Sequence, residues 1–529
     1  MNLKNPILNG FNASSSICKI GDDFFIANPT FEWFPGVMIH HSRDLKNWNL
    51  ISPPLNKKHI NMVGNPDSGG IWAPSLTYFD GELWLVYSDI KVLSNSFKDG
   101  HNYMTRLDLK NKNPVDAIIE SDWSEPTYLN SSGFSPSMFH DDDGKQYILN
   151  MVWDHRSKNN KFYGISIQQY SNFRDRLVAR PEIILKSDEY ELEEYFKIFK
   201  KENYYYILTS KKASNTTIIF RSKNLYGSYE IYNKGFENNS QPSILALNKN
   251  EWIIAYNYKP INQNLEIKKI DWIYDWPVIS KNQELKLKEH KFEKKLIKDD
   301  FDNKILNINF QSLRIPLEPD ILTLNERDGH LRLYGRESLA SKFVQSHIAR
   351  QINSINFEAE TKIEFKPYNF QQMAGLSMYY DTENWVSIYI TYNEELQKKV
   401  LEISTMENQD YNQIFDIPIE LPPDIPIYLK IKMENEIYNF YYSLNEIDFI
   451  KINIDFQSYK ILNFNNINIQ KPTFVGIFCI DGTFSKKYNM QFAAGHQDEI
   501  GVKKWLLTHS DAMPPKVFAD FDYFKYEDH

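Results

Sequence analysis

A short pattern that occurs five times between residues 16 and 258 constrains this chain most. Each copy joins a short apolar segment, a tight polar turn and a second segment rich in aromatic residues, which is typical of a β-hairpin. One hairpin cannot bury its own apolar faces, so such units stack around an axis. Five copies at intervals of about 50 to 60 residues predict a five-bladed β-propeller. The copies begin at Ser16, Ser75, Ser137, Lys197 and Ser243.

The residues directly before each copy would face the central axis of such a propeller. Side chains from all five blades meet there, so we expect ligand binding or chemistry at this ring. The ring holds one carboxylate. Its members are Ser14, Ala73, Ser135, Glu194 with Tyr195, and Gln241.

The second part of the chain has a different pattern. A stretch rich in lysine and glutamate, Lys281 to Lys298, marks a linker. Alternating segments such as Phe357–Phe365 and Trp385–Tyr392 follow, and they predict a β-sandwich. We therefore expect a propeller over residues 1–290 and a C-terminal β-sandwich over 291–529, with a short helix and loop inserted at about 486–518.

Composition narrows the classes of partner. The 529 residues suggest two or three domains, and the net charge of −9 comes without a basic stripe, which argues against nucleic acid and anionic membrane. The aromatic content of 15% suits β-structure and stacking on sugar rings.

No signal peptide or long apolar run is evident, so we expect a cytoplasmic protein. Cys18 and Cys479 lie in apolar segments and are expected to be buried free thiols.

Eight motifs, four in each part of the chain, resemble those of one enzyme family. In the first part they are N-P-I-L-N-G-F-N (Asn5–Asn12), T-F-E-W-F-P-G-V (Thr30–Val37), G-G-I-W-A-P (Gly69–Pro74) and W-D-H-R (Trp153–Arg156). In the second part they are L-R-I-P-L (Leu313–Leu317), G-H-L-R-L-Y-G-R-E-S-L (Gly329–Leu339), F-Q-Q-M-A-G-L (Phe370–Leu376) and D-F-D-Y-F (Asp520–Phe524). They resemble glycoside hydrolase family 43, in the branch of β-xylosidases with an appended sandwich.

This resemblance implies an all-β protein, in which a five-bladed β-propeller is followed by a concanavalin-like, jelly-roll β-sandwich. It also implies inverting hydrolysis of β-xylosides and α-L-arabinofuranosides. That reaction needs a general base and a general acid, with carboxyl groups roughly 6.5–9.5 Å apart. A third carboxylate raises the pKa of the acid, because a nearby like charge disfavours ionisation.

Carrying the family pattern over residue by residue shows losses on the axis. Ser14 stands where the family has its general base, because F-N-A-S-S-S-I replaces F-N-P-D-P-S-I. Ser135 stands at the position of the carboxylate that modulates the acid, and Glu194 at that of the general acid, although Y-F-K follows it instead of G-P-H. Gln241 takes the place of an axial histidine, and Gln263 that of an arginine that contacts the substrate.

The pattern supports three hypotheses. The first is a glycosidase homologue with impaired catalysis that binds a pentoside, another small molecule or a partner. The second is an active β-xylosidase or α-L-arabinofuranosidase that uses Glu194 as the acid and a substitute base such as His155 or Asp67. The third is a repurposed enzyme that acts on a non-sugar substrate. We favour the first or the third, because a serine hydroxyl is a poor base near neutral pH.

The remaining candidate residues each have two interpretations. Trp33, Phe34 and Trp72 either stack on a sugar ring or pack within the blades. Asp154, His155 and Arg156 either line the pocket or form a structural salt bridge, which we favour. We expect no cofactor and no metal site, although a homo-oligomer is possible. The metal-competent residues of the insertion, at spacings that fit no strong motif, are His496, Asp498, Glu499, His509 and Asp511.

Overall fold

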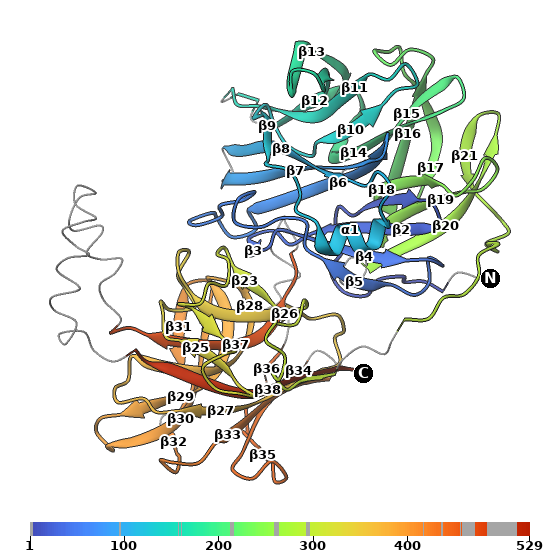
Figure 1. The fold of residues 1–529 in the computed structure, drawn as a ribbon. Coiled ribbons are helices and arrows are strands. Elements are labelled where there is room, and N and C mark those ends of the chain that lie inside the picture. The colour runs from blue at the N-terminus through green and yellow to red at the C-terminus, as the bar shows by residue number, and fades with distance from the viewer. Residues whose placement is uncertain are drawn as a thin grey trace. The chain divides into compact units, whose positions relative to one another are not determined.

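The computed structural model divides the chain into two compact units, Met1–Lys294 and Lys295–His529 (Figure 1). Each unit is built almost entirely of β-strands. The structure describes residues 4–94, 97–156, 158–159, 161–211, 216–237, 239–258, 264–292, 297–415, 417–434, 437–454, 456–457, 471–483 and 516–529.

The first unit contains five four-stranded antiparallel sheets, so the predicted five-bladed propeller is confirmed. In each sheet the strands follow chain order, and the repeat seen in the sequence forms the first two strands. Blade 1 is β1 (Ser16–Ile20), β2 (Asp23–Pro29), β4 (Val37–Ser42) and β5 (Asn49–Ser52). Blade 2 is β6 (Gly70–Phe79), β7 (Glu82–Leu93), β8 (Lys98–Asp108) and β9 (Thr127–Asn130). Blade 3 is β10 (Ser137–His140), β11 (Gln146–Asp154), β12 (Lys161–Ser171) and β13 (Arg176–Lys186). Blade 4 is β14 (Leu192–Lys201), β15 (Tyr204–Lys211), β16 (Thr216–Ser222) and β17 (Glu230–Phe236). Blade 5 is β18 (Asn239–Ala246), β19 (Trp252–Tyr258), β20 (Asn264–Ile273) and β21 (Trp276–Ile279).

Three short elements lie in the connections of this unit. They are β3 (Trp33–Phe34), α1 (Pro114–Glu120) and α2 (Ser187–Tyr190). Helix α1 begins at an Asn113 cap, whose side chain accepts hydrogen bonds from the backbone N–H groups of Val115 and Asp116. It buries Ala117 and Ile118 in the core between blades 1 and 2.

Apolar side chains fill the space between every pair of neighbouring blades. Phe25 and Leu85 belong to the core of blades 1 and 2, and Trp84 and Tyr170 to that of blades 2 and 3. Blades 3 and 4 share one cluster, blades 4 and 5 another, and blades 5 and 1 a third, in which Ile26 packs with Ile253. The five clusters close a ring, because each blade buries one face against each neighbour.

The N-terminal segment adds to this closure. The N–H of Ile7 donates to the carbonyl of Leu265 in β20 at 2.8 Å. The side chain of Asn5 exchanges two hydrogen bonds with the backbone of Ile267, at 2.9 and 3.0 Å. The start of the chain is thus bound to the last blade, and this contact fixes the path of the backbone that leads to Ser14.

The second unit is a sandwich of two antiparallel sheets, and the predicted strand Phe357–Phe365 is confirmed as β27. One sheet has the order β24-β25-β38-β27-β33-β34-β35, with β22 beside β38 and β36 beside β34; the other runs β23-β26-β37-β28-β29-β30-β31, with β32 beside β30. Residues of both sheets, such as Ile363 and Leu376, form one core. The strands are β22 (Lys298–Asp299), β23 (Gln311–Leu313), β24 (Leu322–Thr323), β25 (Leu331–Tyr334), β26 (Ser346–Gln351), β27 (Phe357–Phe365), β28 (Gln372–Asp381), β29 (Asn384–Asn393), β30 (Lys398–Glu407), β31 (Asp410–Gln413), β32 (Ile419–Glu420), β33 (Ile427–Glu434), β34 (Ile437–Ser443), β35 (Ile450–Lys451), β36 (Phe456–Gln457), β37 (Phe474–Asp481) and β38 (Phe518–Asp528).

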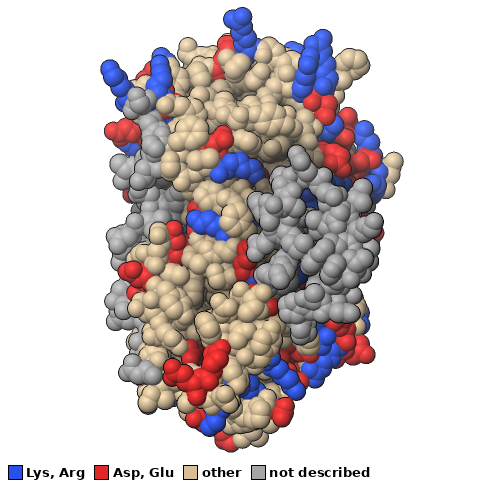
Figure 2. Space-filling model, turned by 90° about the vertical axis from the view of Figure 1, so that its left-hand side faces the viewer, with Lys and Arg blue, Asp and Glu red and all other residues tan. Residues whose placement is uncertain are grey.

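The surface carries charges of both signs. On the face that Figure 2 shows, acidic and basic side chains are interspersed, and the described residues form no continuous basic patch there. None of the helices in the described ranges is long and apolar enough to cross a membrane. The insertion expected at about 486–518 falls mainly on residues 484–515, which lie outside the described part of the chain.

The first strands of the blades surround the propeller axis, and two side chains of β14 reach across it. These strands contact one another in a closed ring, β1-β6-β10-β14-β18. The Tyr195 hydroxyl donates to the carbonyl of Ser15 in blade 1 at 3.1 Å. The Lys197 ammonium donates to the carbonyl of Pro74 in blade 2 at 3.3 Å. Neither partner belongs to a blade that neighbours blade 4, so these two bonds cross the propeller axis.

Both cysteines are buried free thiols, as the sequence predicted. Burial raises the pKa of Cys18 to about 12 and also raises the pKa of Cys479. A thiol reacts as its thiolate. We therefore expect that a chromogenic disulfide reagent titrates no thiol in the native protein at pH 8. The same reagent should titrate two thiols per chain in guanidinium chloride. Prompt reaction of either cysteine in the native state would contradict the burial described above.

The Lys197→Met substitution is expected to change how stability depends on pH. Burial lowers the pKa of Lys197 to about 7, whereas an unfolded lysine titrates near 10.4. Between these values the unfolded chain binds more protons, so this residue makes the folded state more stable as pH rises. The free energy of unfolding of the wild type should gain about 2 kcal/mol between pH 7 and pH 9 relative to Lys197→Met.

Denaturant titrations at both pH values measure this difference. Lys201→Met is the matched control, because Lys201 lies on the same strand and pairs with the exposed Glu202 at 2.6 Å. Parallel pH profiles for the wild type and Lys197→Met would mean that the amine keeps its ordinary pKa.

Candidate binding site on the propeller axis

The structure gives four of the predicted axial residues the same backbone conformation. Ser14, Ala73, Ser135 and Gln241 have φ angles of 55°, 45°, 54° and 50°. This left-handed conformation is uncommon outside glycine and points to a geometrical constraint shared by the blades. Each residue stands two positions before the residue that starts the regular pairing of its blade. These pairs are Ser16 with Ala27, Ser75 with Val86, Ser137 with Leu149 and Ser243 with Ala255.

The same count identifies the axial residue of blade 4. There the regular pairing starts with Phe196 opposite Thr209, after a register shift that follows Leu192. Two positions before Phe196 is Glu194, at the place that the sequence analysis gave it. The side chain of Glu194 lies outside the described part of the chain, as does the whole of Gln263. Their assigned roles stay predictions.

Ser14 and Gln241 contact each other across the junction of blades 1 and 5. The side-chain oxygen Oε1 of Gln241 accepts a hydrogen bond from the N–H of Ser14 at 2.6 Å. The N–H of Gln241 donates to the hydroxyl of Ser210 at 3.2 Å. Within the described ranges, the Ser14 hydroxyl and the Gln241 amide nitrogen have no further partner. Both groups are therefore available to a ligand on the axis.

A chain of polar side chains holds Ser135. The N–H of Ser135 donates to the Ser88 hydroxyl at 3.1 Å, and that hydroxyl donates to Oδ1 of Asn102 at 2.7 Å. The Asn102 amide in turn donates to the carbonyl of Gly133 at 3.2 Å and to the side chain of Asn130 at 2.9 Å. All of these groups are buried or half-buried, so the bonds fix the backbone at Ser135 and in the segment directly before it.

The sequence analysis missed these supporting residues. In three blades a polar residue near the end of the second strand bonds to the axial segment of the next blade: Ser88 to Ser135, Ser210 to Gln241, and Asn257 to the carbonyl of Asn12 at 2.7 Å. A sequence signal existed, because serine or asparagine recurs after the aromatic-rich part of each second strand. Its function depends on which backbone the next blade presents, which the sequence does not show.

Aromatic rings adjoin the axial residues. Trp72 directly precedes Ala73, and Phe134 directly precedes Ser135; their centroids are 5.4 Å apart with an edge-to-face geometry. Phe31 contacts Trp72 at 6.2 Å and Phe11 at 5.6 Å. Trp72 is half-buried, and its indole N–H donates to the carbonyl of Ser68 at 2.8 Å, which fixes the ring plane. These rings form an aromatic wall in which Phe11, Phe31 and Phe134 are buried and Trp72 is half-buried, so Trp72 is the member with ring surface on which a sugar could stack.

The other two predicted aromatics lie in β3. Trp33 is only 1% exposed, and Phe34 is half-buried and packs against the core of blades 1 and 2. The packing interpretation thus describes their observed surroundings, and a contact with a ligand stays a prediction. The sequence analysis had not singled out Phe11, Phe31 or Phe134 for the aromatic wall.

Asp154 and Arg156 form the salt bridge that the sequence analysis favoured. The guanidinium of Arg156 binds Asp154 through two bonds of 2.8 and 2.7 Å, and the Asn159 amide adds a third at 2.8 Å. These bonds, led by the one from Arg156, hold the pKa of Asp154 below its usual value. His155 is exposed, and its ring lies 4.7 Å from that of Phe97. Its suggested role as a base stays a prediction.

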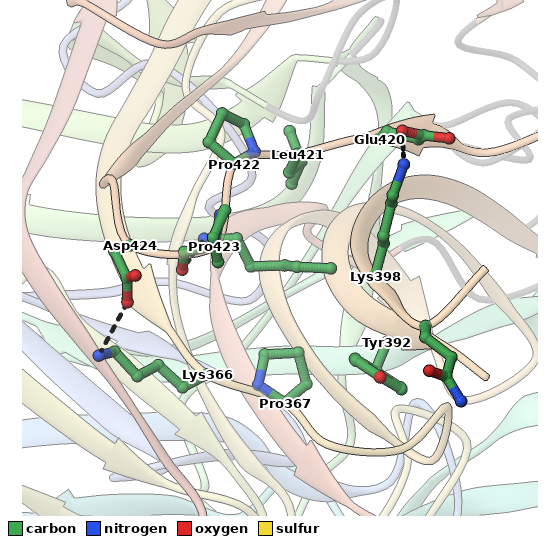
Figure 3. A pocket seen from close by; sticks show the side chains of 11 residues that line it. Lys366, Pro367, Tyr392, Lys398, Glu420, Leu421, Pro422, Pro423 and Asp424 are labelled. Atoms are coloured by element: carbon green, nitrogen blue, oxygen red, sulfur yellow. Dashed lines mark hydrogen bonds and ion pairs between the residues drawn. The ribbon is translucent and has the colours of Figure 1, made fainter.

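The second unit contains a pocket of about 690 Å³, which Figure 3 shows. Four of its charged side chains form two ion pairs, Lys398 with Glu420 at 2.5 Å and Lys366 with Asp424 at 3.4 Å, and Lys399 donates to the carbonyl of Pro423 at 3.0 Å. Tyr392 supplies the aromatic part of the lining. Because both carboxylates already have cationic partners, this pocket lacks the features of an acid–base centre.

No cluster of three or more histidine, cysteine, aspartate or glutamate residues suited to a metal ion occurs in the described ranges. The five metal-competent residues of the insertion lie within residues 484–515, outside those ranges. The described axial residues offer hydroxyl, amide, amine and aromatic groups, and Glu194 stays a predicted member of the site.

Comparisons with known proteins agree with this architecture. The model of glycosyl hydrolases family 43 matches residues 3–277, and the model of the β-xylosidase C-terminal concanavalin A-like domain matches residues 298–493. A β-xylosidase of Bacillus subtilis (strain 168) is 39% identical over 91% of this chain and 97% of its own length. A putative β-xylosidase of Escherichia coli (strain K12) is 31% identical over the full length of both chains.

Among solved structures, a xylan β-1,4-xylosidase from Bacillus halodurans C-125 superposes with a TM-score of 0.87. It is 35% identical, and the match covers 99% of this chain and 100% of the other. The similarity thus extends over both units of the chain. This protein belongs to glycoside hydrolase family 43 and carries the concanavalin-like C-terminal domain found in that family's β-xylosidases.

Proposed function

We propose that this chain is a family 43 homologue that binds a glycoside on the propeller axis without hydrolysing it by the inverting mechanism. The observation that supports this most is the placement of Ser14 and Ser135. Both occupy left-handed axial positions equivalent to those of Ala73 and Gln241 in blades 2 and 5, which supports the residue-by-residue comparison with the family. At these two positions the family resemblance implies carboxylates.

The physical consequence is the loss of acid–base function. A serine hydroxyl cannot act as a general base near neutral pH unless a neighbouring base takes the hydroxyl proton. Such positioned groups contribute about 10²–10⁴-fold each to rate. Ser135 also brings no charge that would raise the pKa of Glu194. A site that has lost both groups retains Glu194 as an isolated candidate acid.

The groups that remain suit binding. The free hydroxyl of Ser14 and the amide nitrogen of Gln241 offer hydrogen bonds to sugar hydroxyls, and the wall around Trp72 offers an apolar face. A site with one aromatic wall and a few convergent polar groups is typical of small-molecule binding. We therefore propose a pentoside or a related small molecule as the ligand.

Active hydrolysis is the second candidate function. It is favoured by the 39% identity to a protein named β-xylosidase, and it would need Glu194 as the acid with a substitute base such as His155 or Asp67. The His155 ring is exposed and lies beside Phe97, with no described bond to an axial residue. These surroundings favour the first candidate function over active hydrolysis with His155 as the base. A non-sugar substrate in the same channel is the remaining alternative.

Hydrolysis of aryl β-xyloside and aryl α-L-arabinofuranoside tests the proposal. We expect the wild type and Glu194→Ala to release the aryl group at the same rate as buffer, because no base activates water. A family 43 β-xylosidase that retains both carboxylates serves as the positive control. Turnover by the wild type that Glu194→Ala abolishes would refute the proposal and establish the second candidate.

A further inference from the structure

A buried amine lies near the propeller axis, and no described residue supplies a counter-ion to it. Lys197 is 7% exposed. Its contacts in the described part of the chain are the Pro74 carbonyl at 3.3 Å and the face of the Tyr195 ring, whose centroid is 5.2 Å from Nζ. Buried lysines ordinarily pair with a carboxylate. An ammonium offers three N–H donors, so most of its hydrogen-bonding capacity is unused here.

The strands that surround the channel bring no described charge to compensate this amine. Blade 1 contributes Ser14, blade 2 Ala73, blade 3 Ser135 and blade 5 Gln241, all of which are neutral. From β14 itself come Tyr195, a phenol whose pKa burial raises, and Glu194, whose side chain is not described. Burial is the cause that lowers the pKa of Lys197, and no charge of the described residues contributes.

Three groups of the described axial residues can donate hydrogen bonds to a ligand. They are the Lys197 amine, the Gln241 amide nitrogen and the Ser14 hydroxyl. Two of the three positions where the resemblance implies carboxylates now hold hydroxyls, and a lysine has replaced a histidine of the family pattern. This set of groups favours a ligand that brings its own negative charge.

We propose that the axial site recognises a glycoside that carries a carboxylate, a uronide, and that the Lys197 amine binds this carboxylate. The inference rests on the proposed function, that is, on glycoside binding at the axis. The present partner of the Lys197 amine, the carbonyl of Pro74, is 3.3 Å away and uncharged. A carboxylate would form a shorter and stronger bond with this ammonium group. The flexible four-carbon stem of lysine allows the amine to turn toward the ligand.

The single charge of Lys197 selects a carboxylate over a phosphate. A carboxylate carries one negative charge, which one ammonium neutralises. A phosphate monoester carries about 1.5 to 2 near pH 7, so part of its charge would remain buried without a partner. The aromatic wall around Trp72 favours a sugar ring as the rest of the ligand.

Binding of such a ligand should take up protons. The amine is about half protonated at pH 7 in the free protein, and a carboxylate beside it stabilises the protonated form. The complex then holds up to about half a proton more per site than the free protein and ligand at that pH. A neutral glycoside lacks this effect.

Three methyl β-glycosides test the inference by isothermal titration calorimetry at pH 7. The xyloside has hydrogen at C5, the glucoside has a hydroxymethyl group there and the glucuronide a carboxylate, so the last two differ mainly in charge. We expect the wild type to bind the glucuronide at least about tenfold more tightly than the glucoside. Titrations in phosphate and in Tris should report uptake of about half a proton for the glucuronide.

Lys197→Met and Lys201→Met separate the amine from general effects. Lys197→Met should fold, since it replaces a buried amine that has no described counter-ion by an apolar side chain of similar length, and its melting temperature checks this. It should lose the preference for the glucuronide and the proton uptake, whereas Lys201→Met should keep both. A preference that survives in folded Lys197→Met would overturn the inference.

The remaining outcomes distinguish the two proposals. Binding of the xyloside with no preference for the glucuronide would refute the uronide inference and leave the proposed function intact. Hydrolysis of aryl xyloside that depends on Glu194 would refute the proposed function, whichever sugar binds. Failure of all three glycosides to bind would overturn the uronide inference.

Discussion

The burial of apolar faces between neighbouring blades is the interaction on which the rest of this propeller depends. Each four-stranded sheet has two faces to cover, and five clusters cover them in a closed ring. The ring fixes the positions of the first strands, and thereby the backbone that reaches the axis. The hydrogen bonds of Asn5 and Ile7 to blade 5 connect the start of the chain to this ring. Axial groups can then be substituted at little cost to the fold, because the blades and not the axis supply most of the buried apolar surface.

Under the proposed function, this division explains how the family scaffold can persist with different residues on its axis. Ser14 and Ser135 keep the left-handed backbone of the axial positions, although their side chains carry no charge. The conformation is imposed by the bonds around it, such as that from the N–H of Ser135 to Ser88. Because these bonds use backbone groups, they hold for any side chain at the position. The scaffold therefore preserves the geometry of a site whose chemistry depends on the residues present.

Under the proposed function, the axis differs from the family pattern in its electrostatic character as well as in its acid–base groups. A carboxylate-rich site and a site with a buried amine attract different ligands, because charge burial is costly without an opposite charge. Lys197 and Tyr195 both come from β14, directly after the position of Glu194, and both bind carbonyls of blades on the far side of the channel. Blade 4 is thus the part of the ring whose side chains most alter the channel.

The sequence by itself determined the five hairpins, the location of the axial residues and the second domain of alternating strands. It could do so because repeats and alternation are local properties, which the pattern of apolar residues expresses directly. The salt bridge of Asp154 with Arg156 was also predictable, since the two residues are two positions apart. The tertiary structure alone decided three features of the axis. They are the left-handed backbone of the axial residues, the bond between Ser135 and Ser88, and the contact of Lys197 with Pro74. They join residues of different blades, and their partners depend on how the ring closes, which no local pattern encodes.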